Sequence, residues 1–186
     1  MSLAGPLSAV RGGAPPQQDP VHFREIADMA NPNAELIERF YRSFQALDAE
    51  GMAACYAHDI RFQDPVFGTL HGGEAADMWR MLLARAADFS LTYGNIRTSG
   101  QTASAASVAT YRFTPTGRTV VNDIRSRFAI RDGLIVEHTD SFDLWRWSRQ
   151  ALGLKGWLFG ATPLVQKALR KEARRNLADF RRKRGS

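Results

Sequence analysis

Cysteine is almost absent from this chain of 186 residues, because Cys55 is its single thiol. An intrachain disulfide is therefore excluded, and the composition is compatible with a reducing compartment. Long apolar runs are also missing, and the N-terminal residues lack a basic region followed by an apolar segment. The sequence thus predicts neither a membrane span nor a signal peptide, and a cytoplasmic location is the expectation that follows.

Motifs for metals and cofactors are missing as well. The four histidines are scattered, and no Cys or His spacing is typical of a metal site. No glycine-rich phosphate loop is present, and no serine lies in a nucleophile elbow. We therefore expect no cofactor and no metal ion, so that any chemistry has to come from ordinary side chains.

The formal net charge of +6 comes from one terminal segment. Between Pro163 and Arg184 nine cationic residues oppose two acids, whereas the rest of the chain is close to neutral. There is thus no strong case for nucleic acid, which favours a positive charge spread over a domain. The same segment repeats apolar residues at helical spacing, namely Val165, Leu169, Ala173, Leu177 and Phe180. It predicts a basic amphipathic helix, for which docking on the domain is favoured over attachment to an anionic membrane or nucleic acid.

Composition divides the chain into three parts. Residues 1–28 are rich in Gly, Pro, Ala and Gln without a sustained period, which predicts a disordered lead. Residues 29–147 carry the periodic segments of one domain, and residues 148–186 hold an apolar stretch interrupted by glycines and then the basic helix. The stretch is too short to span a bilayer. Packing against its own domain is favoured over a lid, a dimer contact or a membrane-surface patch.

Helical periodicity comes first within the domain, and strand periodicity follows. The helices are expected to begin near Asn31, Asp48 and Gly72. Short extended pieces are expected at 60–64 and 69–71, and from Phe89 onward the apolar residues alternate. This order predicts an α+β fold in which a curved antiparallel sheet wraps round the N-terminal helices to form a cone-shaped cavity, with a C-terminal helical extension.

A predicted hairpin between Thr119 and Trp145 carries the most informative residues. Alternation gives its first strand the inward set Val120, Asn122, Ile124, Ser126, Phe128 and Ile130. The inward set of its second strand is Leu134, Val136, His138, Asp140, Phe142 and Leu144. A three-residue Arg-Asp-Gly loop that pairs Ile130 with Leu134 keeps these sets together. It places Ser126 opposite His138 and Ile124 opposite Asp140.

Asp140 and His138 lie two residues apart on this inward, mostly apolar face. A carboxyl in such surroundings is hard to ionise, which is how proteins tune acids for proton transfer. The alternative interpretation is structural, with Asp140 as a satisfied core group hydrogen-bonded to backbone or to His138. Both interpretations are open at this point.

Two segments carry a resemblance to a known superfamily. They are Phe62–Gly68, with the letters FQDPVFG, and Asp132–Asp143, with the letters DGLIVEHTDSFD. Over residues 31–147 the chain resembles the nuclear transport factor two superfamily, which includes ketosteroid isomerases, SnoaL-like polyketide cyclases and limonene epoxide hydrolases. The resemblance implies the cone-shaped fold, whereas the reaction has to be argued from the site.

Asp64, in the run Asp-Pro-Val, matches the motif that holds the catalytic base of ketosteroid isomerases. The tyrosine and the aspartate of their oxyanion hole fall on Phe40 and near Ser126. This departure disfavours steroid-type isomerisation, because a base without electrophilic donors gains little transition-state stabilisation. A structural alternative also exists for Asp64, since an aspartate before proline at a strand end is a common turn residue.

The other two families match less completely. Asp140 corresponds to the final-strand acid of limonene epoxide hydrolases, but two of their other residues align with Ser107 and Ala109, so most of that machinery is missing. SnoaL-like cyclases use an aspartate near a histidine, and Asp140 and His138 have the right chemical types. Together these resemblances imply catalytic roles for Asp140, Asp64 and His138.

Two functional hypotheses follow. The first is a cofactor-independent isomerase, cyclase or hydrolase that acts on a small apolar ligand by acid/base chemistry. The ligand would be lined by Phe40, Tyr41, Tyr56, Phe62, Trp79, Asn122, Ser126, Phe128 and Phe142. The second is a non-catalytic binding or assembly module whose basic helix gives peripheral attachment, for example to a membrane. The resemblance also implies a homodimer formed through the outer face of the sheet, where charged residues would make the contact polar.

Overall fold

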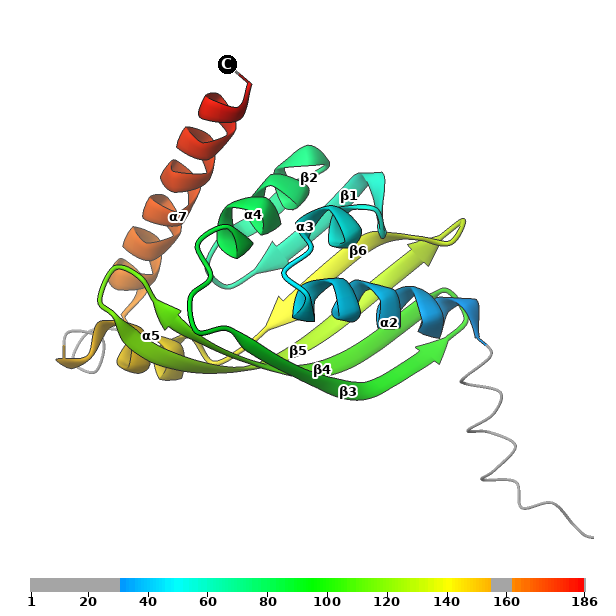
Figure 1. Ribbon diagram of the computed structural model, residues 1–186, viewed down its shortest axis with the longest axis horizontal. Helices are drawn as coiled ribbons and strands as arrows, with labels where there is room; N and C mark the ends of the chain where they lie inside the picture. The colour runs from blue at the N-terminus through cyan, green and yellow to red at the C-terminus, as the bar shows by residue number, and fades with distance from the viewer. Residues whose placement is uncertain (1–30, 155–161, 186) are drawn as a thin grey trace, which may run out of the picture.

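The computed structural model describes residues 31–154 and 162–185. The predicted lead, residues 1–28, and most of the apolar stretch that follows residue 150 lie outside these described residues. Three helices lie against one face of a curved six-stranded sheet (Figure 1). None of the described helices combines the length and the apolar character that crossing a membrane requires.

The three helices start where the sequence predicts. Helix α2 spans Pro32–Gln45, α3 spans Ala49–Ala53 and α4 spans Gly73–Leu83. The side chain of Asn31 caps α2 by accepting the backbone N–H of Asn33 at 2.9 Å, and Asp48 caps α3 in the same way. The buried residues of α2 are Leu36, Ile37, Phe40, Tyr41 and Phe44, and they form the apolar stripe that covers the sheet.

The sheet has the strand order β2-β1-β6-β5-β4-β3. Its strands are β1 Tyr56–Asp64, β2 Gly68–His71, β3 Ser90–Ser99, β4 Thr102–Phe113, β5 Arg118–Arg131 and β6 Leu134–Ser141. Neighbouring strands are antiparallel except for β1 and β6, which pair in parallel. The sheet is therefore mixed, which corrects the antiparallel expectation. Helix α4 and the β3–β5 meander form the long connection that a parallel pair needs.

The turn between β5 and β6 differs from the predicted three-residue loop. Asp132 and Gly133 alone form it, both with positive φ, at 52° and 73°. Ile130 consequently pairs with Ile135 and not with Leu134. Ile135 is fully buried, whereas Leu134 is only partly buried, so the predicted inward set was wrong next to the turn.

A β-bulge restores the predicted inward face further along β6. Val136 is the extra residue on this strand, so the pairing shifts by one beyond it. Ser126 then lies opposite Asp140, and Phe128 lies opposite His138. The polar residues still point inward, although the predicted cross-strand partners were wrong by one pair.

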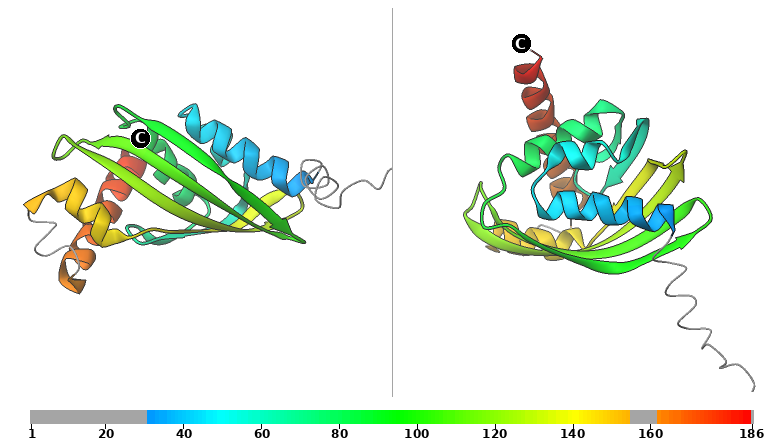
Figure 2. Two further views of the ribbon diagram at one scale, coloured as in Figure 1. Left: turned by 90° about the horizontal axis from the view of Figure 1, so that it is seen from below. Right: turned by 45° about the vertical axis from the view of Figure 1, so that its right-hand side comes forward.

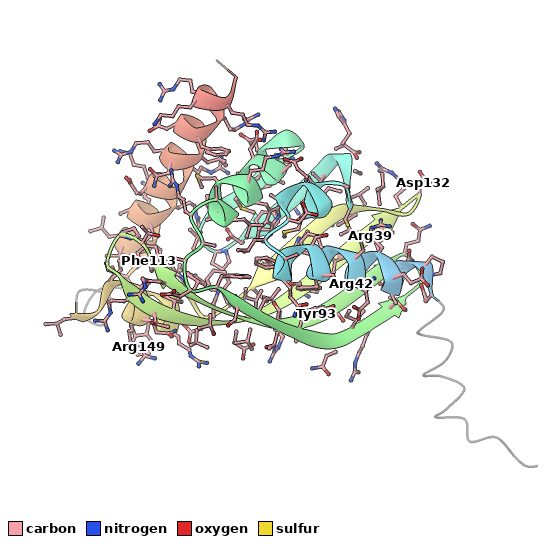
Figure 3. All side chains as sticks on the ribbon, in the orientation of Figure 1. Arg39, Arg42, Tyr93, Phe113, Asp132 and Arg149 are labelled. Atoms are coloured by element: carbon pink, nitrogen blue, oxygen red, sulfur yellow. The ribbon has the colours of Figure 1, made fainter. Side chains whose placement is uncertain are left out.

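The C-terminal part folds back on the domain. Strand β6 ends at Ser141, before the predicted Trp145, because Asp143 caps helix α5, Leu144–Leu152. Helix α7, Pro163–Arg184, then runs beside α4 (Figure 2). Its Leu177 is 3% exposed and belongs to the main hydrophobic core. The hairpin tip at Asp132 lies at the opposite end of the molecule from α5 (Figure 3).

Two hollows of about 360 and 470 Å³ open on the convex face of the sheet. Polar side chains such as Asp123, Arg125 and Arg127 line them. Asn122 and Phe142, which were predicted to line a ligand cavity, lie along the first of these hollows. Neither hollow is lined by His138 or Asp140, so the cone-shaped cavity on the inner face stays a prediction.

Candidate active site

Strand β6 directs two polar side chains, His138 and Asp140, to the face that the helices cover. Their exposed fractions are 1% and 9%. Five aromatic rings surround the imidazole with centroids 4.4 to 6.4 Å away, and they belong to Phe40, Tyr56, Phe62, Trp79 and Phe128. These five residues, all predicted to line the cavity, form an aromatic cage around His138.

A hydrogen-bonded chain enters the cage from Trp79. Its indole Nε1 donates to the Tyr56 hydroxyl at 2.9 Å, and that hydroxyl lies 2.7 Å from His138 Nδ1. Because an indole N–H only donates, Tyr56 accepts from Trp79 and can donate to Nδ1. The imidazole hydrogen then sits on Nε2, which donates to Asp140 Oδ1 at 2.8 Å. Burial raises the pKa of Tyr56 well above its usual value, which keeps this proton on the phenol.

A second chain reaches Asp140 from helix α2. The Tyr41 hydroxyl donates to Ser126 Oγ at 2.9 Å, and Ser126 donates to Asp140 Oδ1 at 2.5 Å. Burial, followed by the charge of Asp140, raises the pKa of Tyr41. Both chains therefore end on one oxygen, Oδ1, whereas Oδ2 accepts no hydrogen bond from the described residues. The arrangement orients the carboxyl and leaves one of its oxygens for another partner.

The Tyr56 hydroxyl should contribute measurably to stability. Tyr56→Phe leaves both the Trp79 indole N–H and His138 Nδ1 without a partner inside the core. We expect it to lower the free energy of unfolding by about 2–3 kcal/mol, which urea denaturation measures. The control is Tyr93→Phe, which removes a partly buried hydroxyl bonded to Glu38 and should cost less than about 1 kcal/mol. Equal losses in the two variants would contradict the buried chain.

Asp64 lies beside Asp140 because β1 pairs in parallel with β6. Phe62 is opposite His138 and Gln63 is opposite Thr139, and Asp64 and Asp140 are the next residues along the two strands. Paired strands are about 5 Å apart. The side chains of Asp64 and Asp140 fall on the same face as Phe62 and His138, since alternate residues share a face. Two acids separated by 76 positions in the sequence thus form one site.

The carboxyl of Asp64 is half-buried and has a second role in the local turn. Its Oδ1 accepts the backbone N–H of Phe67 at 2.5 Å, so the turn interpretation of this residue is confirmed. Burial raises the pKa of Asp64 to about 7, the Phe67 hydrogen bond opposes this rise, and the charge of Asp140 adds to it. Asp64 therefore changes its protonation state near neutral pH, as a general acid or base should.

Tyr111 is a candidate that the sequence analysis missed. Its hydroxyl accepts the indole N–H of Trp147 at 2.8 Å, and the described residues offer no acceptor for its own hydrogen. Burial raises the pKa of Tyr111, the hydrogen bond from Trp147 opposes this rise, and the charge of Asp64 adds to it. The signal was present in the alternation of β4, because Tyr111 shares a face with the buried Ala109. The phenol therefore has a hydrogen that none of the described residues accepts.

The described residues contain no group of three or more His, Cys, Asp or Glu side chains that could hold a metal ion. Asp64, Asp140 and Tyr111 are the proton-donating and proton-accepting groups of the candidate site. Val66 and Tyr111 contact both the main hydrophobic core and a second, smaller cluster around Trp147. The site therefore lies where two apolar clusters meet, at partly exposed residues that a ligand could reach.

One protein-family profile matches this chain. The profile of the SnoaL-like domain matches residues 37–138, which is more than half of the chain. The chain belongs to the SnoaL-like domain family. The resemblance to the nuclear transport factor two superfamily and the α+β fold that it implied are thereby confirmed. A comparison with curated proteins gives no significant match.

Solved structures with the same fold include proteins named as polyketide cyclases and as an epoxide hydrolase. TerC, crystallised with polyporic acid, is 19% identical with a TM-score of 0.59, covering 66% of this chain and 100% of TerC. A protein assigned as a polyketide cyclase from a Silicibacter species is 22% identical with a TM-score of 0.58, covering 64% and 94%. A limonene-type epoxide hydrolase from M. tuberculosis is 22% identical with a TM-score of 0.55, covering 72% and 95%. At these identities the similarity shows the fold.

Proposed function

We propose that this SnoaL-like protein is a cofactor-independent enzyme that moves a proton on a small, largely apolar carbonyl compound, as an isomerase or a cyclase does. The proposal is supported by the positions of Asp64 and Asp140, which directly follow the paired residues Gln63 and Thr139 of the parallel strands β1 and β6. The charge of Asp140 contributes to the raised pKa of Asp64, about 7. Two acids with different environments can divide the work of acid and base between them.

Asp64 is the group that we assign to proton transfer at carbon. Near neutral pH both its protonated and its ionised forms are populated, so it can take a proton and return it to a neighbouring atom. The Tyr111 hydroxyl, held by the Trp147 indole and left with a free hydrogen, would donate to the substrate oxygen on which charge develops. This phenol would thus serve as the electrophilic donor. In ketosteroid isomerases that donor is a tyrosine, whose position corresponds to Phe40 in this chain.

Asp140 would act through its free oxygen, Oδ2. Ser126 and His138 fix the carboxyl through Oδ1 and are positioning residues, since they act through Asp140. His138 is enclosed by its aromatic cage and has both ring nitrogens occupied, so direct contact with a substrate is not part of its role. Of the three residues predicted to be catalytic, Asp64 and Asp140 therefore keep that assignment.

The substrate class follows from the apolar surroundings. The carboxyl pair adjoins Phe62 in the main core, and Tyr111 and Val66 also contact the second cluster. Two relatives support a small organic ligand: TerC was crystallised with polyporic acid, and another protein of this fold was crystallised with trimethylamine. A flat, polyketide-like ketone or quinone with an acidic C–H bond suits this site.

Hydrogen exchange at carbon tests the proposal without knowledge of the natural substrate. The chain is incubated in deuterium oxide with a panel of cyclic enones, diketones and hydroxyquinones, and mass spectrometry measures deuterium at carbon. We expect exchange above the buffer rate for at least one compound, with an inflection near pH 7 that reports Asp64. Asp140→Asn should slow the exchange, whereas Asp123→Asn, on the convex face, should not. Buffer-rate exchange across the panel would count against the enzyme.

A second candidate function is a non-catalytic module that binds an apolar ligand or assembles with a partner. The observation that favours it is the cage around His138, in which the polar atoms satisfy one another as in a structural core. Such a module would bind members of the same panel without exchanging their hydrogens. The homodimer, the peripheral membrane contact and the cytoplasmic location stay predictions in either case.

A further inference from the structure

Helix α7 lies outside the part of the chain that the SnoaL-like profile matches, residues 37–138. It nevertheless packs on the domain beside α4 (Figures 1 and 2). Leu177 is buried in the main core together with the partly buried Ala173 and Phe180, and Leu169 packs in the second cluster. The helix therefore contributes to both apolar clusters that meet at the acid pair.

Two arginines of α7 bind the turn that follows Asp64. Arg174 donates through Nε to the carbonyl of Phe67 at 2.9 Å and through Nη2 to the carbonyl of Thr69. Arg170 donates to the carbonyl of Pro65 at 3.1 Å. Two carbonyls of the turn and one of strand β2 thus accept hydrogen bonds from guanidinium groups, which can bind several acceptors in a fixed geometry.

The backbone of Phe67 connects Arg174 to the carboxyl of Asp64. Its N–H binds Asp64 Oδ1 at 2.5 Å, while its carbonyl binds Arg174. Gly68 follows with a φ of +68°, and a Cβ there would lie 3.5 Å from Arg170 Cδ. Glycine adopts this left-handed backbone without strain, and 3.5 Å is an ordinary van der Waals distance. Two sets of hydrogen bonds consequently fix the conformation of the turn: one joins Phe67 to Asp64, and the other comes from the arginines of α7.

Ion pairs hold the far end of α7 on α4. Arg181 pairs with Asp77 at 3.0 Å and with Glu74 at 3.5 Å, and Arg184 pairs with Asp77 at 2.9 Å. Asp77 is shared between these arginines, and its side chain is 17% exposed. The helix is therefore fixed at both ends of its contact with the domain, which gives Arg174 a defined position.

We propose that Arg174 is a positioning residue of the acid/base site. Helix α7 covers the turn that follows Asp64 and thereby keeps water away from its carboxyl. The inference rests on the proposed role of Asp64. The groups that face this carboxyl are Asp140 from β6, Tyr111 from β4, and the two arginines of α7 at the carbonyls of its turn. Among them Arg174 makes the most contacts to the turn and none to either carboxyl.

The test is the pKa of Asp64 in the full chain, followed by carbon NMR of labelled aspartate. In Arg174→Met the turn loses two hydrogen bonds and opens to water. We expect the pKa of Asp64 to fall by one or more pH units from about 7, because burial is the main cause of its rise. Arg174→Lys, which keeps one donor group on the turn, should give an intermediate value and serves if the methionine variant does not fold.

Arg175→Met is the matched control. Arg175 is the next residue of the same helix and pairs with Glu172 on its exposed side, so its loss should leave Asp64 unchanged. A pKa near 7 in the wild type and in both Arg174 variants would overturn the role of Arg174 and leave the proposed function standing. A pKa near 4 in the wild type would overturn both.

Discussion

Asp64→Asn is expected to be more stable than the wild type above pH 7, by on the order of 4 kcal/mol. The carboxyl of Asp64 has a folded-state pKa of about 7 against an ordinary value of 3.8. The folded protein therefore holds a proton that the unfolded chain releases, and the wild type loses stability as the pH rises from about 4 to about 7. Asparagine has no proton to lose, and its side-chain oxygen can still accept the Phe67 N–H.

Urea denaturation at pH 4 and pH 8 measures this difference. The two proteins should unfold with nearly equal free energy at pH 4, and the variant should gain at pH 8. Asp59→Asn is the control, because Arg131 lowers the pKa of that exposed carboxyl and its removal should bring no gain at high pH. Equal stability of wild type and Asp64→Asn at both pH values would show that Asp64 ionises freely in the folded state.

The same substitution is expected to lower the rate of carbon-bound hydrogen exchange by about 10²–10⁴, the range that general acid/base groups contribute. The loss should appear with whichever compound of the panel the wild type exchanges, since Asp64 is the group that handles the proton. Deuterium uptake followed by mass spectrometry measures it. Because the variant is expected to be more stable, a lower rate cannot be attributed to unfolding. Full activity of Asp64→Asn would transfer the catalytic role to Asp140.

A gain in stability together with a loss of activity is typical of a functional residue. The partial burial of the Asp64 carboxyl near the charge of Asp140 lowers the stability of the folded protein. A residue that only forms the turn would not require this loss of stability. The hydrogen bond to Phe67 explains why a turn-forming residue stands there, but Asn or Ser would serve the turn equally well. The two interpretations of Asp64 are therefore complementary.

The inward face of β5 could be predicted from the sequence because strand alternation is insensitive to register. Asn122, Ser126 and Phe128 are buried as their spacing required. The cross-strand partners could not be predicted, since two solutions keep the same apolar residues together. A three-residue loop is one, and a two-residue Asp-Gly turn followed by a bulge at Val136 is the other. Hydrophobic pattern alone does not distinguish them.

Some residues of the candidate site could also be predicted from the alternation of residues along one strand. His138 and Asp140 share a strand, so their proximity is a local property of the sequence. The proximity of Asp64 to Asp140 depends on the parallel pairing of β1 with β6, which an antiparallel sheet would not provide. Arg174 binds the turn only because α7 docks beside it, and no periodicity in the sequence indicates which of nine cations faces inward.

The pKa of Asp64 in the wild type and in Asp140→Asn is the measurement that tests the paired carboxyls most directly. Carbon NMR of labelled aspartate gives both values without any substrate. We predict a pKa of about 7 in the wild type and a lower one in Asp140→Asn, because the charge of Asp140 contributes to the rise. A wild-type pKa near 4 that does not respond to the loss of Asp140 would contradict the acid pair, and with it the proposed proton transfer.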